Sequence, residues 1–143
     1  MESAIVSVLG GRKYLGKRIS GPSDFDKLIR QGFRWESVSH AKETVGLTDQ
    51  ELASLLDISE RTLIRFRKNK KRLGAVASDR LYRLALIFSF AKEVLEDDKM
   101  ALEWLHKPQF GLGGRVPLEM LQTEAGAREV EDLLGRVEYG AIS

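Results

Sequence analysis

The chain has 143 residues, of which 43% are hydrophobic and 31% are charged, a composition typical of globular proteins. No apolar run approaches the roughly 20 residues that a membrane-spanning helix needs, and the first ten residues lack the basic segment of a signal peptide. Because there is no cysteine, disulfides, thiolate metal sites and cysteine nucleophiles are excluded. We therefore expect a cytoplasmic protein that does not associate with a membrane.

The charge is distributed unevenly along the chain. The formal net charge is +2, but residues 93–143 hold eleven acidic and five basic residues, a charge of −6, which leaves +8 for residues 1–92. Such an asymmetry indicates different partners at the two ends. Nucleic acid would suit the basic part, and a protein would suit the acidic part.

The first third of the chain predicts an arm followed by two helices. Residues 1–22 are rich in glycine, serine and basic side chains, and we expect an amino-terminal arm with at most one short strand or helix near residues 5–9. A helix is then expected with Ser23 as its N-cap and Gly32 at its end. The next helix is expected over residues 35–45, stopped by the following glycine.

Two short helices are predicted next. Thr48-Asp49-Gln50-Glu51 has the pattern of a capping box, in which the threonine hydroxyl and the glutamate side chain each bind a free backbone amide. The apolar spacing of the helix that follows the box ends around Asp57. Ser59 is expected to cap another helix from Glu60 to about Lys70. Gly74 is expected to close this unit.

The remaining elements are also predicted to be helices. Ser78 is expected to cap a long helix that runs to about Glu96 and is apolar on most sides. Such a helix is buried on most sides, as a strut between two domains or as part of a dimer interface. A short helix around Trp104, a loop over residues 108–115, a helical turn and a last helix capped by Thr123 follow.

The two short helices over residues 49–68, joined by three residues, have the spacing of a DNA-reading helix-turn-helix. Asp57 stands where such turns commonly place glycine, and aspartate tolerates the left-handed conformation better than most residues. With Leu63 and Phe66 facing inward, the second helix presents a basic face: residues 61–72 include seven basic residues and no acid. Helical hairpins of this kind also occur in proteins that do not bind DNA, but the acid-free basic stretch favours DNA binding.

The candidate DNA-binding residues fall into two groups. Those near the start of the second helix would reach base edges, and the basic residues that follow it would hold phosphates. They are Ser59, Glu60, Arg61, Thr62, Ile64, Arg65, Lys68, Lys70, Lys71 and Arg72.

An ordered set of residues in the last third of the chain points to a known family. The set is Ala101-Leu102-Glu103-Trp104-Leu105, Pro108, Leu112-Gly113-Gly114, Pro117, Met120-Leu121, Thr123, Gly126, Val130, Leu133-Leu134, Val137 and Gly140. It resembles the toxin-binding domain of the Xre/ParS/MbcA antitoxins, and the preceding helix-turn-helix and long helix match their arrangement. The resemblance covers about residues 23–141.

The resemblance implies a partner and an activity. The partner would be a RES-type toxin, which is similar to ADP-ribosyltransferases and consumes or transfers from NAD, and the antitoxin would block its NAD pocket and repress its own operon. An acidic surface with a carboxy-terminal tail suits a pocket lined with arginines. The candidate toxin-binding residues are Arg115, Glu119, Arg128, Glu138, Tyr139, Gly140, Ala141, Ile142 and Ser143.

Other conspicuous residues predict no further site. The glycines of residues 111–114 lack the spacing of a dinucleotide or phosphate loop, so a tight turn is expected. Trp104 and Phe110 are expected in the core, and His40 and His106 have no partner at metal-ligand spacing. We predict no catalytic residue, metal or cofactor.

Together these observations predict an all-α protein in which a helix-turn-helix DNA-binding domain is joined by a long helix to a small helical toxin-binding domain. The expected parts are an arm (1–22), an Xre-like helix-turn-helix domain (23–77) and the connecting helix with the toxin-binding domain (78–143). We expect operator DNA and a RES-type toxin as partners, and a homodimer or larger assembly. Two alternatives stay open: a dimeric helix-turn-helix regulator whose carboxy-terminal domain dimerises or senses a ligand, and an interaction protein that no longer binds DNA.

Overall fold

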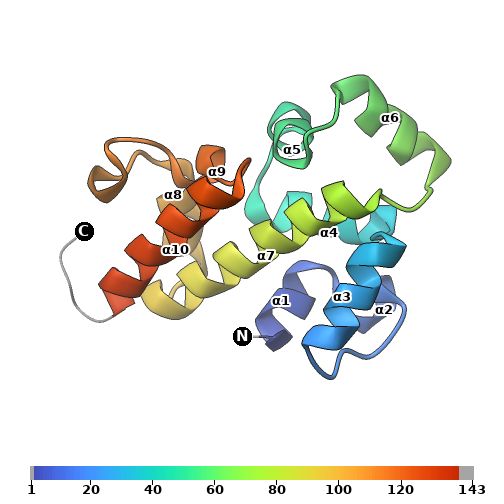
Figure 1. Ribbon diagram of the computed structural model, residues 1–143, viewed down its shortest axis with the longest axis horizontal. Helices are drawn as coiled ribbons and strands as arrows, with labels where there is room; N and C mark the ends of the chain where they lie inside the picture. The colour runs from blue at the N-terminus through green and yellow to red at the C-terminus, as the bar shows by residue number, and fades with distance from the viewer. Residues whose placement is uncertain (1, 139–143) are drawn as a thin grey trace.

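The computed structural model describes residues 2–138, and in this range the regular structure is helical, with no strands (Figure 1). The all-α prediction is confirmed. The elements are α1 (Glu2–Val8), α2 (Gly11–Leu15), α3 (Pro22–Gln31), α4 (Trp35–Val45), α5 (Asp49–Leu56), α6 (Glu60–Asn69), α7 (Ala75–Leu95), α8 (Asp98–His106), the 3₁₀ turn η1 (Phe110–Leu112), α9 (Pro117–Met120) and α10 (Glu124–Glu138).

The 21-residue helix α7 runs through the middle of the molecule. Figure 1 shows α1 to α6 gathered around its first half and α8 to α10 around its second half, and α7 contacts α1, α3, α4, α5, α8 and α10. Leu81, Leu84, Ala85, Ile87 and Ala91 have no exposed surface. The prediction of a long helix buried on most sides is confirmed, because both halves of the chain cover it.

The amino-terminal segment differs from the predicted arm. It forms two helices, α1 and α2, and α1 packs against α7. Ile5, Val8 and Leu9 lie at the spacing of one helical face and are buried. The prediction of at most one short element here is wrong, because three apolar side chains on one face are enough to dock a short helix when a hydrophobic surface receives it.

Two predicted helix starts are also wrong. Helix α3 begins at Pro22, with Gly21 as its N-cap, so Ser23 lies inside the helix. The proline occupies the first turn, where its missing N–H is not needed. The Asp24 carboxylate accepts hydrogen bonds from the backbone amide and hydroxyl of Ser20 (2.7 and 2.8 Å), and these bonds lower its pKa to about 2.

Ser78 is likewise an interior residue, because α7 begins at Ala75 after the N-cap Gly74. Its buried hydroxyl accepts a hydrogen bond from the Phe33 amide (3.0 Å) and donates to the Leu73 carbonyl (3.4 Å). The serine therefore serves a tertiary contact between the α3–α4 connection and the α6–α7 loop. The N-cap predicted for the last helix is confirmed: the Thr123 hydroxyl accepts from the Gly126 amide (3.0 Å).

Candidate DNA-binding and partner-binding surfaces

Local interactions build the helix-turn-helix as the sequence predicts. The Thr48 hydroxyl accepts from the Glu51 amide (3.1 Å) and the Glu51 carboxylate from the Thr48 amide (2.8 Å), so the capping box is confirmed. Asp57 ends α5 in the left-handed conformation (φ 56°, ψ 46°). Ser59 caps α6 by accepting from the Thr62 amide (3.0 Å). These local signals fix the angle at which α6 leaves the turn.

Helix α6 presents one polar face to solvent. Leu63 and Phe66 point into the core, whereas Ile64 keeps 56% of its surface exposed. The candidate DNA-binding residues are all exposed: Ser59, Glu60, Arg61, Thr62, Ile64, Arg65, Lys68, Lys70, Lys71 and Arg72. The structure therefore exposes every residue of the predicted set, on α6 and on the segment that follows it.

Two arginines of the basic stretch have structural contacts. Arg67 donates to an Asp49 carboxylate oxygen at 2.6 Å, which lowers the pKa of Asp49, and its guanidinium lies 5.2 Å from the centre of the Trp35 ring. Arg67 thus ties α6 to α4 and α5. Arg72, a candidate phosphate contact, donates to the Gly32 carbonyl at 2.9 Å, a contact that spacing along the chain does not reveal.

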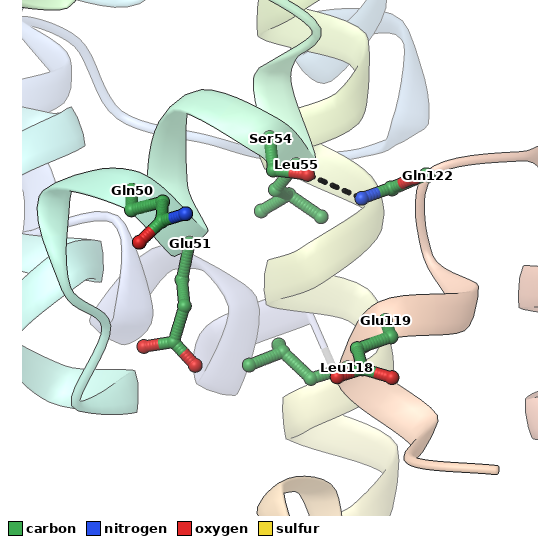
Figure 2. A pocket seen from close by; sticks show the side chains of 7 residues that line it. All are labelled: Gln50, Glu51, Ser54, Leu55, Leu118, Glu119 and Gln122. Atoms are coloured by element: carbon green, nitrogen blue, oxygen red, sulfur yellow. Dashed lines mark hydrogen bonds between the residues drawn. The ribbon is translucent and has the colours of Figure 1, made fainter. Parts of the chain in front are cut away.

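A groove of about 440 Å³ separates α5 from the α9 segment. Figure 2 shows Gln50, Glu51, Ser54 and Leu55 on one side and Leu118, Glu119 and Gln122 on the other. The Gln122 amide donates to the Ser54 hydroxyl at one end of the groove (Figure 2).

Arginines of α7 reinforce this junction. Arg80 donates to the Gln122 carbonyl at 2.9 Å and lies 3.9 Å from the Asp57 carboxylate, while Arg83 donates to the Leu121 carbonyl at 3.0 Å. Arg80 therefore links the turn of the helix-turn-helix to the segment before α10. Sequence reasoning missed this link, because no local pattern marks it.

The candidate toxin-binding residues do not form one cluster. Arg115 and Glu119 line a shared depression beside α10, and Arg115 pairs with Glu129 at 3.1 Å. Arg128 lines a different depression and pairs with Glu124 at 3.3 Å on the same helix. Glu138 is exposed at the last residue of α10. Tyr139, Gly140, Ala141, Ile142 and Ser143 lie outside the described residues.

The structure confirms some of the predictions for the aromatic residues and contradicts one. Trp104 packs partly buried against the core, as expected, but Phe110 is 91% exposed, so its predicted core position is wrong. The tight turn after it is confirmed, with Gly113 left-handed at the end of η1. Rings of His40 and His106 bind backbone carbonyls (3.0 and 2.8 Å).

Residues 2–138 offer neither a cluster of side chains placed to bind a metal nor a membrane-spanning helix. This range holds no group of three or more His, Cys, Asp or Glu side chains placed to bind a metal ion. None of its helices combines the length and the apolar character that crossing a membrane would require.

The fold and these surfaces define a helix-turn-helix protein with a second helical unit on a shared central helix. The model of the antitoxin Xre-like helix-turn-helix domain matches residues 24–86, and that of the antitoxin Xre/MbcA/ParS C-terminal toxin-binding domain matches residues 90–140. The chain belongs to the Xre/MbcA/ParS antitoxin family, as its sequence pattern predicts.

Curated relatives agree with this assignment. The chain is 33% identical to an Antitoxin Xre of Yersinia enterocolitica over 116 residues, which are 80% of this chain and 78% of the relative. It is 33% identical to an Antitoxin Xre of Photorhabdus laumondii (87% and 84% covered) and 32% identical to one of Pseudomonas putida (82% and 74%).

A solved structure shares the fold. A chain of the M. tuberculosis MbcT-MbcA toxin-antitoxin complex superposes with a TM-score of 0.55 at 24% identity, covering 74% of this chain and 94% of that chain. The two chains therefore share a helical fold.

Proposed function

We propose that this antitoxin binds and neutralises a RES-type, NAD-consuming toxin and represses its own operon through the helix-turn-helix. Residues 23–77 would bind operator DNA, residues 78–143 would bind the toxin, and the protein would act as a homodimer or larger assembly without catalytic activity of its own. The observation that carries the proposal is the exposed, acid-free basic segment over residues 61–72, set against the charge of −6 on residues 93–143.

The geometry of α6 supports DNA reading. Its first turn is exposed, and Arg61, Ile64 and Arg65 are spaced so that they share one solvent-facing side. Arginine pairs bidentately with guanine and an apolar side chain contacts the thymine methyl, so a correct base contact is worth about 1–3 kcal/mol. Lys70 and Lys71, exposed after the helix, suit phosphate contacts, which position the protein without reading sequence.

The test of base reading is Arg61→Ala with Arg65→Ala, measured by retention of the protein's own promoter fragment. The expected loss in affinity is about 1–3 kcal/mol per residue, with an unchanged melting temperature because both side chains are exposed. The matched control is Lys99→Ala with Arg136→Ala, which removes the same charge from exposed positions of the second unit and should bind like wild type. Equal retention by both double variants would exclude α6 as the recognition helix.

Phosphate binding has a separate signature in salt. If a dimer neutralises roughly 6–10 phosphates, affinity falls about 10³- to 10⁵-fold between 50 and 200 mM salt. Lys71→Ala should weaken binding to specific and unrelated DNA alike and reduce the salt dependence. An affinity that does not respond to salt would contradict the assignment. Arg72 is unsuited to this test, because its contact with Gly32 supports the fold as well.

On the toxin side, the proposal depends on the acidic second unit. Arg115, Glu119, Arg128 and Glu138 are exposed there, and carboxylates suit a pocket that holds an anionic dinucleotide with cationic groups. The test is co-expression with a cognate RES-type toxin, read out as co-purification, cellular NAD and growth. Wild type should protect, and deletion of residues 138–143 should reduce protection. Full protection by the truncated chain would remove the tail from the mechanism.

Assembly state and the toxin complex complete the test. Light scattering of the purified protein should give at least twice the mass of one 16.1 kDa chain, as two operator half-sites require. A protein that binds its own promoter fragment but captures no RES-type toxin would instead be a dimeric helix-turn-helix regulator.

A further inference from the structure

The loop between α8 and α9 carries a large apolar side chain in full contact with water. Phe110 is 91% exposed, more than any other large hydrophobic residue in the described part of the chain. The glycines beyond it have open space around them: a Cβ added at Gly113 or Gly114 would meet no atom within 4 Å. The loop therefore turns the Phe110 ring and the two glycines toward solvent, while Leu112 between them stays buried.

Hydrogen bonds hold this projecting loop in one shape. The Gln109 carbonyl accepts from the amides of Leu112 (3.0 Å) and Gly114 (2.9 Å), and the Gln109 amide donates to the Arg115 carbonyl at 3.1 Å. The Gln109 side chain donates to the Trp104 carbonyl at 2.9 Å, and Leu112 is buried in the core. The phenyl ring is thus presented on a closed, anchored turn, so that little conformational entropy would be lost when it binds.

The position of the loop indicates its partner. It lies within residues 90–140, which match the toxin-binding domain model, and Figure 1 shows it at the end of the molecule opposite α6. Arg115 connects the loop to the depression that it lines with Glu119, because its guanidinium also donates to the Leu112 carbonyl at 2.7 Å. A partner bound here would leave the DNA-reading face free.

We propose that Phe110 is an aromatic anchor of the toxin interface and inserts into an apolar pocket on the toxin, beside the charged surface that Arg115 and Glu119 provide. The inference rests on the proposed function and adds a specific contact to it. Burial of an exposed aromatic side chain removes a large apolar area from water and so contributes strongly to binding free energy. A few such residues carry most of the binding energy at interfaces.

The test is the full-length chain with Phe110→Ala, titrated against a tagged cognate RES-type toxin. We expect a loss in affinity of roughly 30-fold or more, as for an interface hot spot, and partial recovery with Phe110→Leu. The matched control is Val76→Ala, an exposed apolar residue (70%) in the first turn of α7, which should bind like wild type. The melting temperature should be unchanged in all three variants, because neither side chain is packed in the core, and promoter retention should be unchanged in the two Phe110 variants.

The outcomes separate the inference from the function on which it rests. If wild type fails to bind the enzyme, the proposed toxin partner is wrong, and the anchor fails with it. If wild type binds and Phe110→Ala binds equally well, the function stands and the anchor is refuted. Phe110→Ala could instead lower the mass of the assembly that the antitoxin forms without toxin and leave the toxin affinity unchanged. That result would assign Phe110 to contacts between copies of this chain and would also refute the anchor.

Discussion

Two glycines in α10 provide a matched test of how this helix packs. In a helix interior glycine is less favourable than alanine by roughly 0.5–1 kcal/mol, so propensity alone predicts that alanine stabilises both positions. Their surroundings differ. A Cβ at Gly126 would lie 2.2 Å from the Met120 carbonyl oxygen, whereas a Cβ at Gly135 would meet nothing within 4 Å. The structure therefore predicts opposite signs for the two substitutions.

The clash at Gly126 involves backbone and has no flexible side chain to yield. Relieving it requires the turn from α9 to move away from α10, and overpacking of this kind costs typically about 1–3 kcal/mol. After subtraction of the helix-propensity gain, Gly126→Ala should lower the free energy of unfolding by up to about 2.5 kcal/mol. Gly135→Ala should raise it by about 0.5–1 kcal/mol.

Urea denaturation followed by circular dichroism measures both values, provided that the slope of the free energy against urea concentration is unchanged. Binding to the toxin offers a second readout, because Gly126 lies beside the depression lined by Arg115 and Glu119. A Gly126→Ala variant as stable as Gly135→Ala would show that the Met120 carbonyl does not lie against Gly126.

Three further predictions concern charged contacts. Arg67→Ala should reduce the free energy of unfolding by up to about 1 kcal/mol, since its pair with Asp49 is partly exposed, and urea denaturation measures the change. Arg80→Ala should lower the free energy of unfolding by about 1 kcal/mol, because it removes the hydrogen bond to the Gln122 carbonyl. An unchanged free energy of unfolding would show that the two units do not meet at Arg80. Asp24 has its pKa lowered from 3.8 to about 2, so its contribution to stability is present above pH 4 and is lost as the pH falls toward 2. The difference in melting temperature between wild type and Asp24→Asn should therefore shrink over that range, and a constant difference would contradict the assignment.

Where the signals are local, the sequence predicts this fold closely. The capping box at Thr48, the left-handed Asp57 and the Ser59 cap depend on interactions within four residues of each other, and the structure confirms each one. The apolar spacing of α6 likewise predicts which face is buried and which candidate residues are exposed.

Errors arise where a tertiary partner competes with a local signal. Ser23 and Ser78 are residue types that commonly cap helices, but both lie inside a helix. Helix α3 begins one residue before Ser23, at Pro22. Helix α7 begins at Ala75, and the Ser78 hydroxyl accepts from the distant Phe33 amide. Phe110 was expected in the core from its residue type, but its loop turns outward. Residue type indicates that an aromatic side chain favours burial. Only the path of the backbone decides whether that side chain reaches the core.

The sequence by itself determined the class of fold, the helix-turn-helix, the separation of charge and the family, because periodicity, caps and charge are properties of neighbouring residues. The tertiary structure decided what depends on residues far apart in the chain. It docked α1 on α7, gave Arg67 and Arg72 structural partners, linked the two units through Arg80, and exposed Phe110. The physical reason is that such contacts form between groups tens of residues apart, and their formation depends on how whole helices pack around α7.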